Sequence, residues 1–409
     1  MPSERFDVVV SGASFAGLLL ALALRKSAGS ALSLAVIDPA GASMSKPDFR
    51  AFALSAGSVR LLRALDLWPA IEPLAQPVTR IDITDSPLDS HERQVLLRYD
   101  NHTEEGDPAS HIVESTVLSR AIAEAVQASG PDHIEVDGVE AIVTKPGSVE
   151  IACAKGARLE TRLAVAADGR KSPLRELAGI KTVGWKYPQS AIVTMVRHDR
   201  PHEGVATQHF LPGGPFAILP LAGGHRSSLT WSEGSVEAAR ILALDDAGFL
   251  AEVKRRFGEV LGEVSLDGPR VAYPLEMHLS RSLIADRVAL MGDAARGVHP
   301  IAGQGLNLGL RDVAALAEII VQTHRLGLDI GSVQPLERYQ RWRRFDSVMS
   351  AAAMDGLNKL FSTDNAMLRT LRDAGLGLTD RIPWLKRMLV GEAAGLTGEL
   401  PMLLTGLLP

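Results

Sequence analysis

The sequence predicts an α/β fold in which a parallel sheet is interrupted by an inserted antiparallel sheet and followed by helices. Two apolar segments far apart in the chain, at residues 8–26 and 287–312, each lead through a glycine-rich turn into a helix. Residues 190–231 instead alternate apolar and polar side chains between proline and glycine clusters, which is typical of antiparallel strands. After residue 304 almost every segment has helical spacing. One sheet built from distant parts of the chain, with a second sheet inserted, accounts for this order.

The composition excludes several classes of protein. The chain has 409 residues, of which 46% are hydrophobic and 22% charged, so it can build a large core. Its net charge of −5, without a basic block, argues against a nucleic-acid partner. A single cysteine, Cys153, allows neither an internal disulfide nor a cysteine metal cluster, and fits a reducing compartment. We expect neither a signal peptide nor a membrane-spanning helix, and therefore a cytoplasmic location.

The first elements are expected to form a βαβ unit. Apolar runs predict strands at 6–11 and 33–38, and the intervening segment 15–26 has the composition of a buried helix. The remaining pattern predicts helices at 55–67, 113–129 and 247–261, and strands within 134–168, within 190–231 and at 271–277.

The turn "VVVSGASFAG" joins the first strand to the first helix. Gly12 and Gly17 stand at the first and third positions of a GxGxxG dinucleotide fingerprint, and Ser14 stands at the second. Glycines there allow a tight turn and close packing of helix on strand, while the helix start offers N–H groups to a pyrophosphate. We expect the Ser14 hydroxyl to donate to a phosphate oxygen and Asp38 to accept from a ribose hydroxyl. Taken alone, the motif equally allows a turn without a ligand.

Two later turns repeat the same design. In "LAVAADGRKSPLRELAG" an apolar strand ends at Asp168-Gly169, and in "VALMGDAARGVHPIAGQGLNLGL" another ends at Gly292-Asp293. The Asp293 carboxylate can accept from a sugar or ribityl hydroxyl. Glycines at 303 and 305 let the backbone press against a flat ligand, and Pro300 stiffens the wall of the loop.

These three turns, within 8–38, 164–175 and 287–312, resemble the FAD-binding signatures of the class A flavoprotein monooxygenases, which have the p-hydroxybenzoate hydroxylase-like fold. "HPIAGQGLNLGLRD" is similar to the ubiquinone-biosynthesis hydroxylases within that class, as are "FRAFALSAGSVRLLRALDLW", "YPQSAIVTMV" and "GPFAILPL". The resemblance covers nearly the whole chain in order. It implies a Rossmann-like FAD-binding domain from 1–75, 111–180 and 280–330, a substrate domain from 76–110 and 181–279, and a C-terminal helical region over 331–409.

The resemblance also implies the cofactor-binding residues. Arg50 is expected along the cofactor, Arg120 at its pyrophosphate or ribose, and the loop 300–307 against the isoalloxazine. The sequence departs from the family pattern at two positions. Ser14 replaces a glycine, and Thr116 stands where many members carry arginine. Both departures put the affinity for the cofactor in doubt. The expected cofactor-binding set is Gly12, Ser14, Ala16, Gly17, Asp38, Arg50, Arg120, Asp168, Gly169, Gly292, Asp293, Pro300, Gly303, Gln304, Gly305, Leu306 and Asn307.

The chemistry implied by the resemblance belongs largely to the cofactor. NAD(P)H reduces FAD, oxygen forms a C4a-hydroperoxide, and an oxygen atom is transferred to an electron-rich ring. No metal cluster or Ser–His–Asp order stands out in the sequence. His299 and Pro300 are candidate catalytic positions because they would orient the flavin loop, and a purely structural role for His299 is the alternative. Exclusion of water requires an apolar wall, for which the candidates are Phe210, Pro212, Phe216, Leu219 and Pro220.

The implied substrates are O2 and a polyprenylated phenol or quinone precursor. Because such a molecule resides in a membrane, the basic and apolar segment around Trp384–Met388 is a candidate for peripheral contact with the inner membrane. Packing of that segment on the body, on a second subunit in an oligomer or within a quinone-making complex is the alternative. Three other functions stay open: hydroxylation of a small soluble aromatic or secondary metabolite, reduction of a lipid without oxygen, and a weakly active flavoprotein scaffold.

Overall fold

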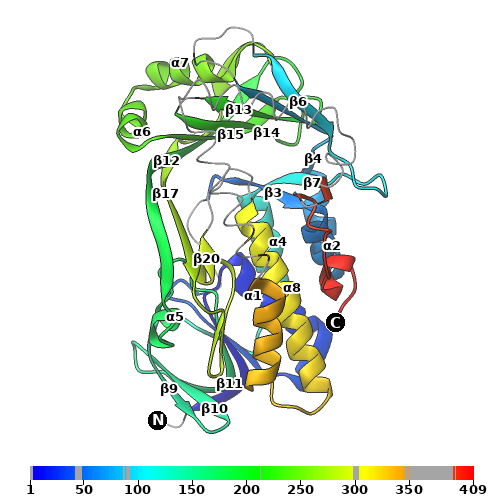
Figure 1. The fold of residues 1–409 in the computed structure, drawn as a ribbon, viewed down its shortest axis with the longest axis vertical. Helices are drawn as coiled ribbons and strands as arrows, with labels where there is room; N and C mark the ends of the chain where they lie inside the picture. The colour runs from blue at the N-terminus through cyan, green and yellow to red at the C-terminus, as the bar shows by residue number, and fades with distance from the viewer. Residues whose placement is uncertain are drawn as a thin grey trace.

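The computed structural model describes residues 3–41, 48–85, 88, 93–211, 213–297, 304–344, 346, 349, 390–391 and 393–409. Within these ranges the strands form one eight-stranded, one nine-stranded and one three-stranded sheet. Figure 1 shows the eight-stranded sheet in the lower part of the molecule and the nine-stranded sheet in the upper part, under α6 (Ser235–Leu242) and α7 (Asp246–Phe257).

The lower sheet is built around the N-terminal strand β1 (Glu4–Ser11), as the βαβ pattern predicts. β1 is parallel to β2 (Leu34–Ile37) on one side and to β11 (Arg158–Ala166) on the other. Helix α1 (Phe15–Ala28) covers this sheet with nine consecutive buried residues, which explains its uniformly apolar sequence. β11 is in turn parallel to β19 (Val288–Leu290), which comes from far along the chain. The other strands of this sheet are β8 (His133–Glu135), β9 (Val139–Lys145), β10 (Ser148–Cys153) and β18 (Ile284–Ala285).

The upper sheet is mainly antiparallel. Its two longest strands, β12 (Thr182–His198) and β17 (Val271–Ser280), pair with each other and connect the upper part of the molecule to the lower part (Figure 1). A small sheet of β3 (Ala51–Ser55), β4 (Gln76–Pro77) and β7 (Ser110–Glu114) lies between the two large sheets (Figure 1). The remaining upper strands are β5 (Arg80–Asp85), β6 (Val95–Asp100), β13 (Val205–Leu211), β14 (Gly214–Pro220), β15 (Arg226–Gly234), β16 (Val264–Leu266) and β20 (Arg296–Gly297).

The upper sheet presents two different faces, because successive side chains of a strand point to opposite sides. One face packs against α6 and α7 in a core that contains Phe216, Trp231 and Phe249. The other face packs against β3 and β7, where Met195 and Ala206 join Ile112 in a second core. We call the second surface the domain face, since it lies toward the glycine turns.

Several element boundaries differ from the sequence prediction for local reasons. Helix α4 (Ser115–Ser129) begins two residues later than expected, because β7 continues to Glu114 and pairs with β3. Helix α7 ends at Phe257, since Gly258 has φ of 78° and closes the helix by donating to the Lys254 carbonyl. The short helices α2 (Ala56–Ala64), α3 (Trp68–Ile71) and α5 (Pro173–Leu177) complete the lower part.

Helix α8 (Gln304–Arg325) carries the most deeply buried carboxylate among the described residues. Asp312 accepts hydrogen bonds from the Gly292 backbone N–H at 2.9 Å, from Arg296 at 2.8 and 2.9 Å, and from Arg343 at 2.8 Å. Burial raises the pKa of Asp312, but the two guanidinium groups outweigh it and hold the pKa below its usual range. Helix α8, the turn after β19 and residue 343 are therefore joined through one charge.

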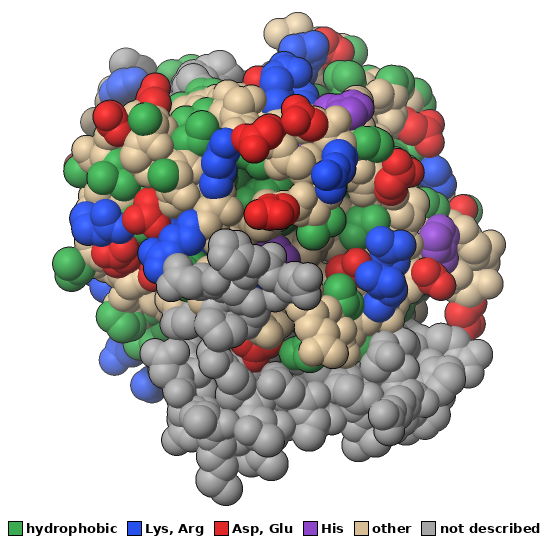
Figure 2. All heavy atoms as spheres, turned by 90° about the horizontal axis from the view of Figure 1, so that it is seen from above, with side chains coloured by type: hydrophobic (Ala, Val, Ile, Leu, Met, Phe, Trp, Pro, Cys, Tyr) green, Lys and Arg blue, Asp and Glu red, His purple; other side chains and the backbone are tan. Residues whose placement is uncertain are grey.

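The surface seen from above carries both signs of charge. Figure 2 shows Lys and Arg side chains interspersed with Asp and Glu over this face, without a continuous patch of either sign. This pattern agrees with the small net charge of −5.

Substitution of Asp312 by Asn is expected to lower the free energy of unfolding by about 3–5 kcal/mol, because it removes the carboxylate that compensates the buried Arg296 and leaves the buried Arg343 with Asp346 as its remaining acidic partner. In the wild type, the stabilisation that comes from ionised Asp312 is fully present above the ordinary carboxyl pKa of 3.8. It is lost as the pH falls below that value, because the pKa of Asp312 is lowered in the folded protein. Denaturant unfolding at pH 7 tests this, with the exposed Asp286→Asn as the matched control. Equal unfolding midpoints for the two variants would contradict the assignment.

Candidate cofactor site

Three turns from distant parts of the sequence meet at one edge of the lower sheet. β1, β11 and β19 are parallel neighbours, so their carboxyl ends lie together and lead into Gly12, Ala167 and Met291 respectively. The second and third turns each begin with a backbone bond to the neighbouring strand: the Ala167 N–H donates to the Ser11 carbonyl at 2.7 Å, and the Met291 N–H donates to the Ala166 carbonyl at 3.0 Å. In an open parallel sheet this edge is where ligands bind.

The first and third glycines of the fingerprint are required by backbone packing. Gly12 has φ of 107°, and a Cβ added there would overlap the Ala167 carbonyl oxygen. A Cβ added at Gly17 would overlap the Gly12 carbonyl oxygen. The turn therefore presses its backbone against both the neighbouring strand and its own helix.

Ser14 has a different role from the one that the sequence suggested. Its Oγ donates to the Ala167 carbonyl at 2.9 Å and accepts from the Gly17 N–H at 3.2 Å, so it is the N-cap of α1. The hydroxyl proton is thus used within the protein, and the expectation that it donates to a phosphate oxygen is wrong for this structure. A cap requires an acceptor oxygen, which explains why serine replaces glycine.

Asp38 and Asp168 stand on either side of the first turn. Asp38 accepts from the Ala13 N–H and the Ala40 N–H, both at 2.8 Å, which holds its carboxylate beside the fingerprint. Asp168 accepts from the Ser11 hydroxyl at 3.0 Å, while its second oxygen, Oδ1, is buried and has no hydrogen-bond partner. Burial raises the pKa of Asp168 more than its hydrogen bonds lower it.

The third turn presents Asp293 to solvent beside Arg170. Gly292 has φ of 55°, which lets the chain reverse after β19. The Asp293 side chain is 51% exposed and lies 3.5 Å from the Arg170 guanidinium, while its carbonyl is bound by His278 at 2.9 Å. Asp293 therefore has a fixed backbone and a carboxylate that is open to a ligand.

Arg50 connects the lower part of the molecule to the domain face. Its guanidinium pairs with Asp48 at 2.8 Å and lies over the rings of Phe52 at 5.2 Å and Tyr273 at 5.4 Å. Burial lowers the pKa of Arg50, but Asp48 outweighs it and raises the pKa, so the cation is retained at all ordinary pH values. Tyr273, which lies beside Arg50, is not predicted from the sequence. It belongs to β17, far from the glycine turns in the sequence, and no motif marks it.

The other predicted cofactor residues are placed as follows. Arg120 and Thr116 are exposed on α4. Gln304, Gly305 and Leu306 form the first turn of α8, and Ala16 is buried in α1. His299, Pro300 and Gly303 lie outside the described residues.

The side chain of Asn307 joins two elements of the protein. Its Oδ1 accepts from the Ser55 N–H at 3.0 Å and from the Ser58 hydroxyl at 2.8 Å, and its Nδ2 donates to the Ala53 carbonyl at 2.8 Å. These bonds tie the start of α8 to β3 and α2, so its side-chain polar groups are already used within the protein.

The predicted apolar wall is divided between the two faces of the upper sheet. Leu219 packs in the core on the domain face, and Phe210 shares that side by strand alternation with Ala206. Phe216 lies in the core under α6 and α7, and alternation places Pro220 on the same side, which corrects the prediction for both residues. Pro212 lies outside the described residues.

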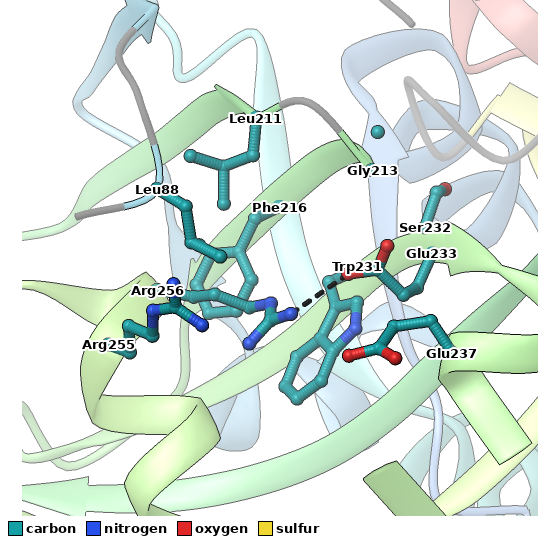
Figure 3. A pocket seen from close by; sticks show the side chains of 11 residues that line it. Leu88, Leu211, Gly213, Phe216, Trp231, Ser232, Glu233, Glu237, Arg255 and Arg256 are labelled. Carbon is teal, nitrogen blue, oxygen red and sulfur yellow. Dashed lines mark hydrogen bonds and ion pairs between the residues drawn. The ribbon is translucent and has the colours of Figure 1, made fainter. Parts of the chain in front are cut away.

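A cavity of about 200 Å³ also lies on the helix side of the sheet. Phe216 and Trp231 line this cavity (Figure 3). The Arg256 guanidinium, which also lines it, donates a hydrogen bond to the Glu233 carboxylate at 2.9 Å. Since Phe216 and Trp231 belong to the core under α6 and α7, this cavity is separate from the edge where the glycine turns meet.

Comparison with known proteins agrees with this geometry. Residues 5–344 match the protein family described as FAD binding domain. A ubiquinone hydroxylase of Rhodospirillum rubrum is 39% identical over 418 residues, covering 98% of this chain and 92% of the relative. The 3-demethoxyubiquinol 3-hydroxylase of Escherichia coli is 30% identical and covers 97% and 100%. The crystal structure of p-nitrophenol 4-monooxygenase from Pseudomonas putida superposes with a TM-score of 0.80 at 21% identity, covering 97% of this chain and 99% of that one.

Substitution of Ser14 by Ala is expected to lower stability by about 1 kcal/mol through loss of the N-cap, while flavin affinity stays within twofold. Titration of the apoprotein with FAD, followed by flavin fluorescence, measures the affinity, and thermal unfolding measures the stability. A tenfold loss of flavin affinity without a change in stability would show that the hydroxyl serves the ligand instead.

Substitution of Asp293 by Ala is expected to strip flavin from a protein that remains folded. The ion pair with Arg170 is exposed and contributes little to folding, whereas the carboxylate is available to accept from a ligand hydroxyl. The flavin-to-protein absorbance ratio after purification measures the loss, and circular dichroism checks the fold. Asp286→Ala, an exposed acid just before β19, is the control. A fully yellow Asp293→Ala protein would refute the role.

Proposed function

We infer that this chain, which belongs to the FAD binding domain family, is an FAD-dependent monooxygenase that works as a hydroxylase in ubiquinone biosynthesis. The observation that carries the proposal is the meeting of three glycine turns at one sheet edge, in a chain whose relatives of matching length are named as ubiquinone hydroxylases. The finer assignment is hydroxylation of the ring of a polyprenylated phenol or quinone precursor, with NAD(P)H as the reductant.

The residues at the sheet edge fit FAD. The glycine cradle at Gly12 and Gly17 has no room for a Cβ and brings backbone to the start of α1, where unpaired N–H groups suit a pyrophosphate. Asp38 and Asp293 present carboxylates that accept from ribose and ribityl hydroxyls. The buried Oδ1 of Asp168 gives the site another acceptor that lacks a protein partner.

When bound, FAD supplies the electron transfer that activates O2 for insertion into a carbon–hydrogen bond. In the overall reaction, one NAD(P)H, one proton and one O2 convert a ring C–H into a ring C–OH. The other products are NAD(P)⁺ and one water. The chain's own residues bind and orient the substrate and keep water out. The Arg50 cation lies over the rings of Phe52 and Tyr273 at the junction of the two parts and is paired there with Asp48.

The domain face suits an apolar substrate better than a charged one. Phe210, Leu219 and Met195 lie on it, and its core with β3 and β7 excludes water. Hydroxylation of a small soluble phenol is the second candidate, because the fold is shared with p-nitrophenol 4-monooxygenase. A scaffold with little activity is a third, and activity assays separate the three.

Membrane contact belongs to the same proposal. In the part of the chain that the structure describes, no helix has the length and apolar character needed to cross a bilayer. The segment around Trp384–Met388, which the sequence marks for peripheral contact with the inner membrane or a quinone-making complex, lies outside the described residues.

We expect the purified holoprotein to hydroxylate a short-tail prenylphenol with consumption of NADH or NADPH and O2. Mass spectrometry of the product and oxygen-electrode measurements test this, with incorporation of ¹⁸O from labelled O2 as the decisive readout. Unprenylated phenol is the matched control, because it lacks the apolar tail that the domain face favours. Background NAD(P)H oxidation with every phenol tried would support the scaffold instead.

A further inference from the structure

Part of the domain face is incompletely covered by the rest of the protein. The strand register aligns Gln208 of β13 with Ala217 of β14, and Ala217 with Thr230 of β15, so the three side chains form one row. All three are only partly buried. On the opposite face of the same strands, Phe216 and Trp231 are 0% and 1% exposed. The domain face of these strands is therefore less completely covered than the helix side.

Gln208 is the polar exception in this row. Its amide Nε2 is buried and has no hydrogen-bond partner among the residues that the structure describes. Its neighbours across and along the sheet are Ile83, Ala217, Ala206 and Phe210, all of which are apolar. A buried donor without a partner costs about 1–3 kcal/mol, which an apolar residue in the same place would avoid. A ligand that accepts from this N–H removes that cost.

Two other polar atoms of the upper sheet that lack a partner do not share this position. Ser228 lies on the same face with its Oγ unpartnered, but the whole residue is 0% exposed, whereas Gln208 is partly exposed. Trp231 Nε1 is also unpartnered, but it lies on the helix side. Gln208 alone among these three combines an unpartnered donor with partial exposure on the domain face.

We propose that Gln208 is a specificity-determining residue, whose amide N–H donates a hydrogen bond to an oxygen substituent on the ring of the prenylated phenol. The proposal rests on the proposed function. The ligand chemistry is an acceptor oxygen of a methoxy, carbonyl or phenolate group, and the neighbouring Phe210, Ala217 and Leu219 contact the ring and its apolar tail. A neutral donor selects the oxygenated ring without placing a charge in an apolar space.

Gln208→Met tests the proposal, because methionine keeps the length of the side chain and removes the donor. The two substrates are short-tail prenylphenols that differ only by one ring methoxy group. For the methoxylated phenol we expect the KM of Gln208→Met to be about tenfold higher than that of the wild type, while kcat changes by no more than twofold. This is the result expected when a variant loses a hydrogen bond that is equally strong in the ground state and the transition state. For the ring without the methoxy group we expect no more than a twofold change in KM.

Stability provides a readout that separates recognition from structure. The free Gln208→Met protein is expected to unfold at the same temperature as the wild type or higher, since an unpaired buried donor has been removed. Thr207→Val is the matched control: it alters the neighbouring residue of β13, whose side chain points to the opposite face. Thr207→Val should leave the ratio of the two KM values unchanged.

The outcomes separate this proposal from the proposed function. Equal changes in KM for both phenols, or the same change in Thr207→Val, would overturn the role of Gln208 while leaving the hydroxylase assignment intact. If the wild type hydroxylates neither phenol, the proposed function fails. In that case the role of Gln208 is tested by measuring the binding of both phenols through the change in flavin absorbance. Equal dissociation constants for the wild type and Gln208→Met would overturn the role of Gln208. Weaker binding of the methoxylated phenol alone would support it.

Discussion

The whole site depends on one backbone contact, the close approach of the first turn to the end of the neighbouring strand. Gly12 lies against the Ala167 carbonyl with no room for a Cβ, and Gly17 lies equally close to Gly12. Because backbone meets backbone, α1 starts at the edge of the sheet, which is the kind of position where helix N–H groups can bind an anion. The Ser14 hydroxyl adds a bond to the same Ala167 carbonyl, so the first two turns form one unit.

The third turn is held by a buried charge in addition to its backbone contacts. Gly292 donates to Asp312, and the same carboxylate binds Arg296 and Arg343. A buried ion group of this kind is stable only when every partner is present, because each charge alone carries a large desolvation cost. The turn after β19 therefore becomes rigid only when α8 and the segment at residue 343 are in place. Its backbone is fixed while the Asp293 carboxylate remains half-exposed, which is what a ligand-binding turn requires.

The sequence predicts what is encoded locally and leaves out what depends on distant partners. The βαβ unit and the glycine positions follow from patterns within about thirty residues, and the structure contains both. The N-cap bond of Ser14 to the Gly17 N–H is local, but its bond to a carbonyl 153 positions away has no signal in the sequence around it. The alternation of side chains along β14 shows that the strand has two apolar faces, but it does not show which layer packs against each face. The prediction that Phe216 lines the wall of the substrate space is wrong for that reason.

The two faces of the upper sheet are packed differently. On the helix side, Phe216, Trp231 and Phe249 stack at centroid distances of 5.5 and 5.8 Å and fix the register of the strands. The row on the domain face is then held in place without help from loops. A change of side chain there alters what the space accepts and leaves both the cofactor turns and the core unchanged. Substrate choice in such a fold is therefore expected to reside in the few domain-face positions, like that of Gln208, that packing leaves free.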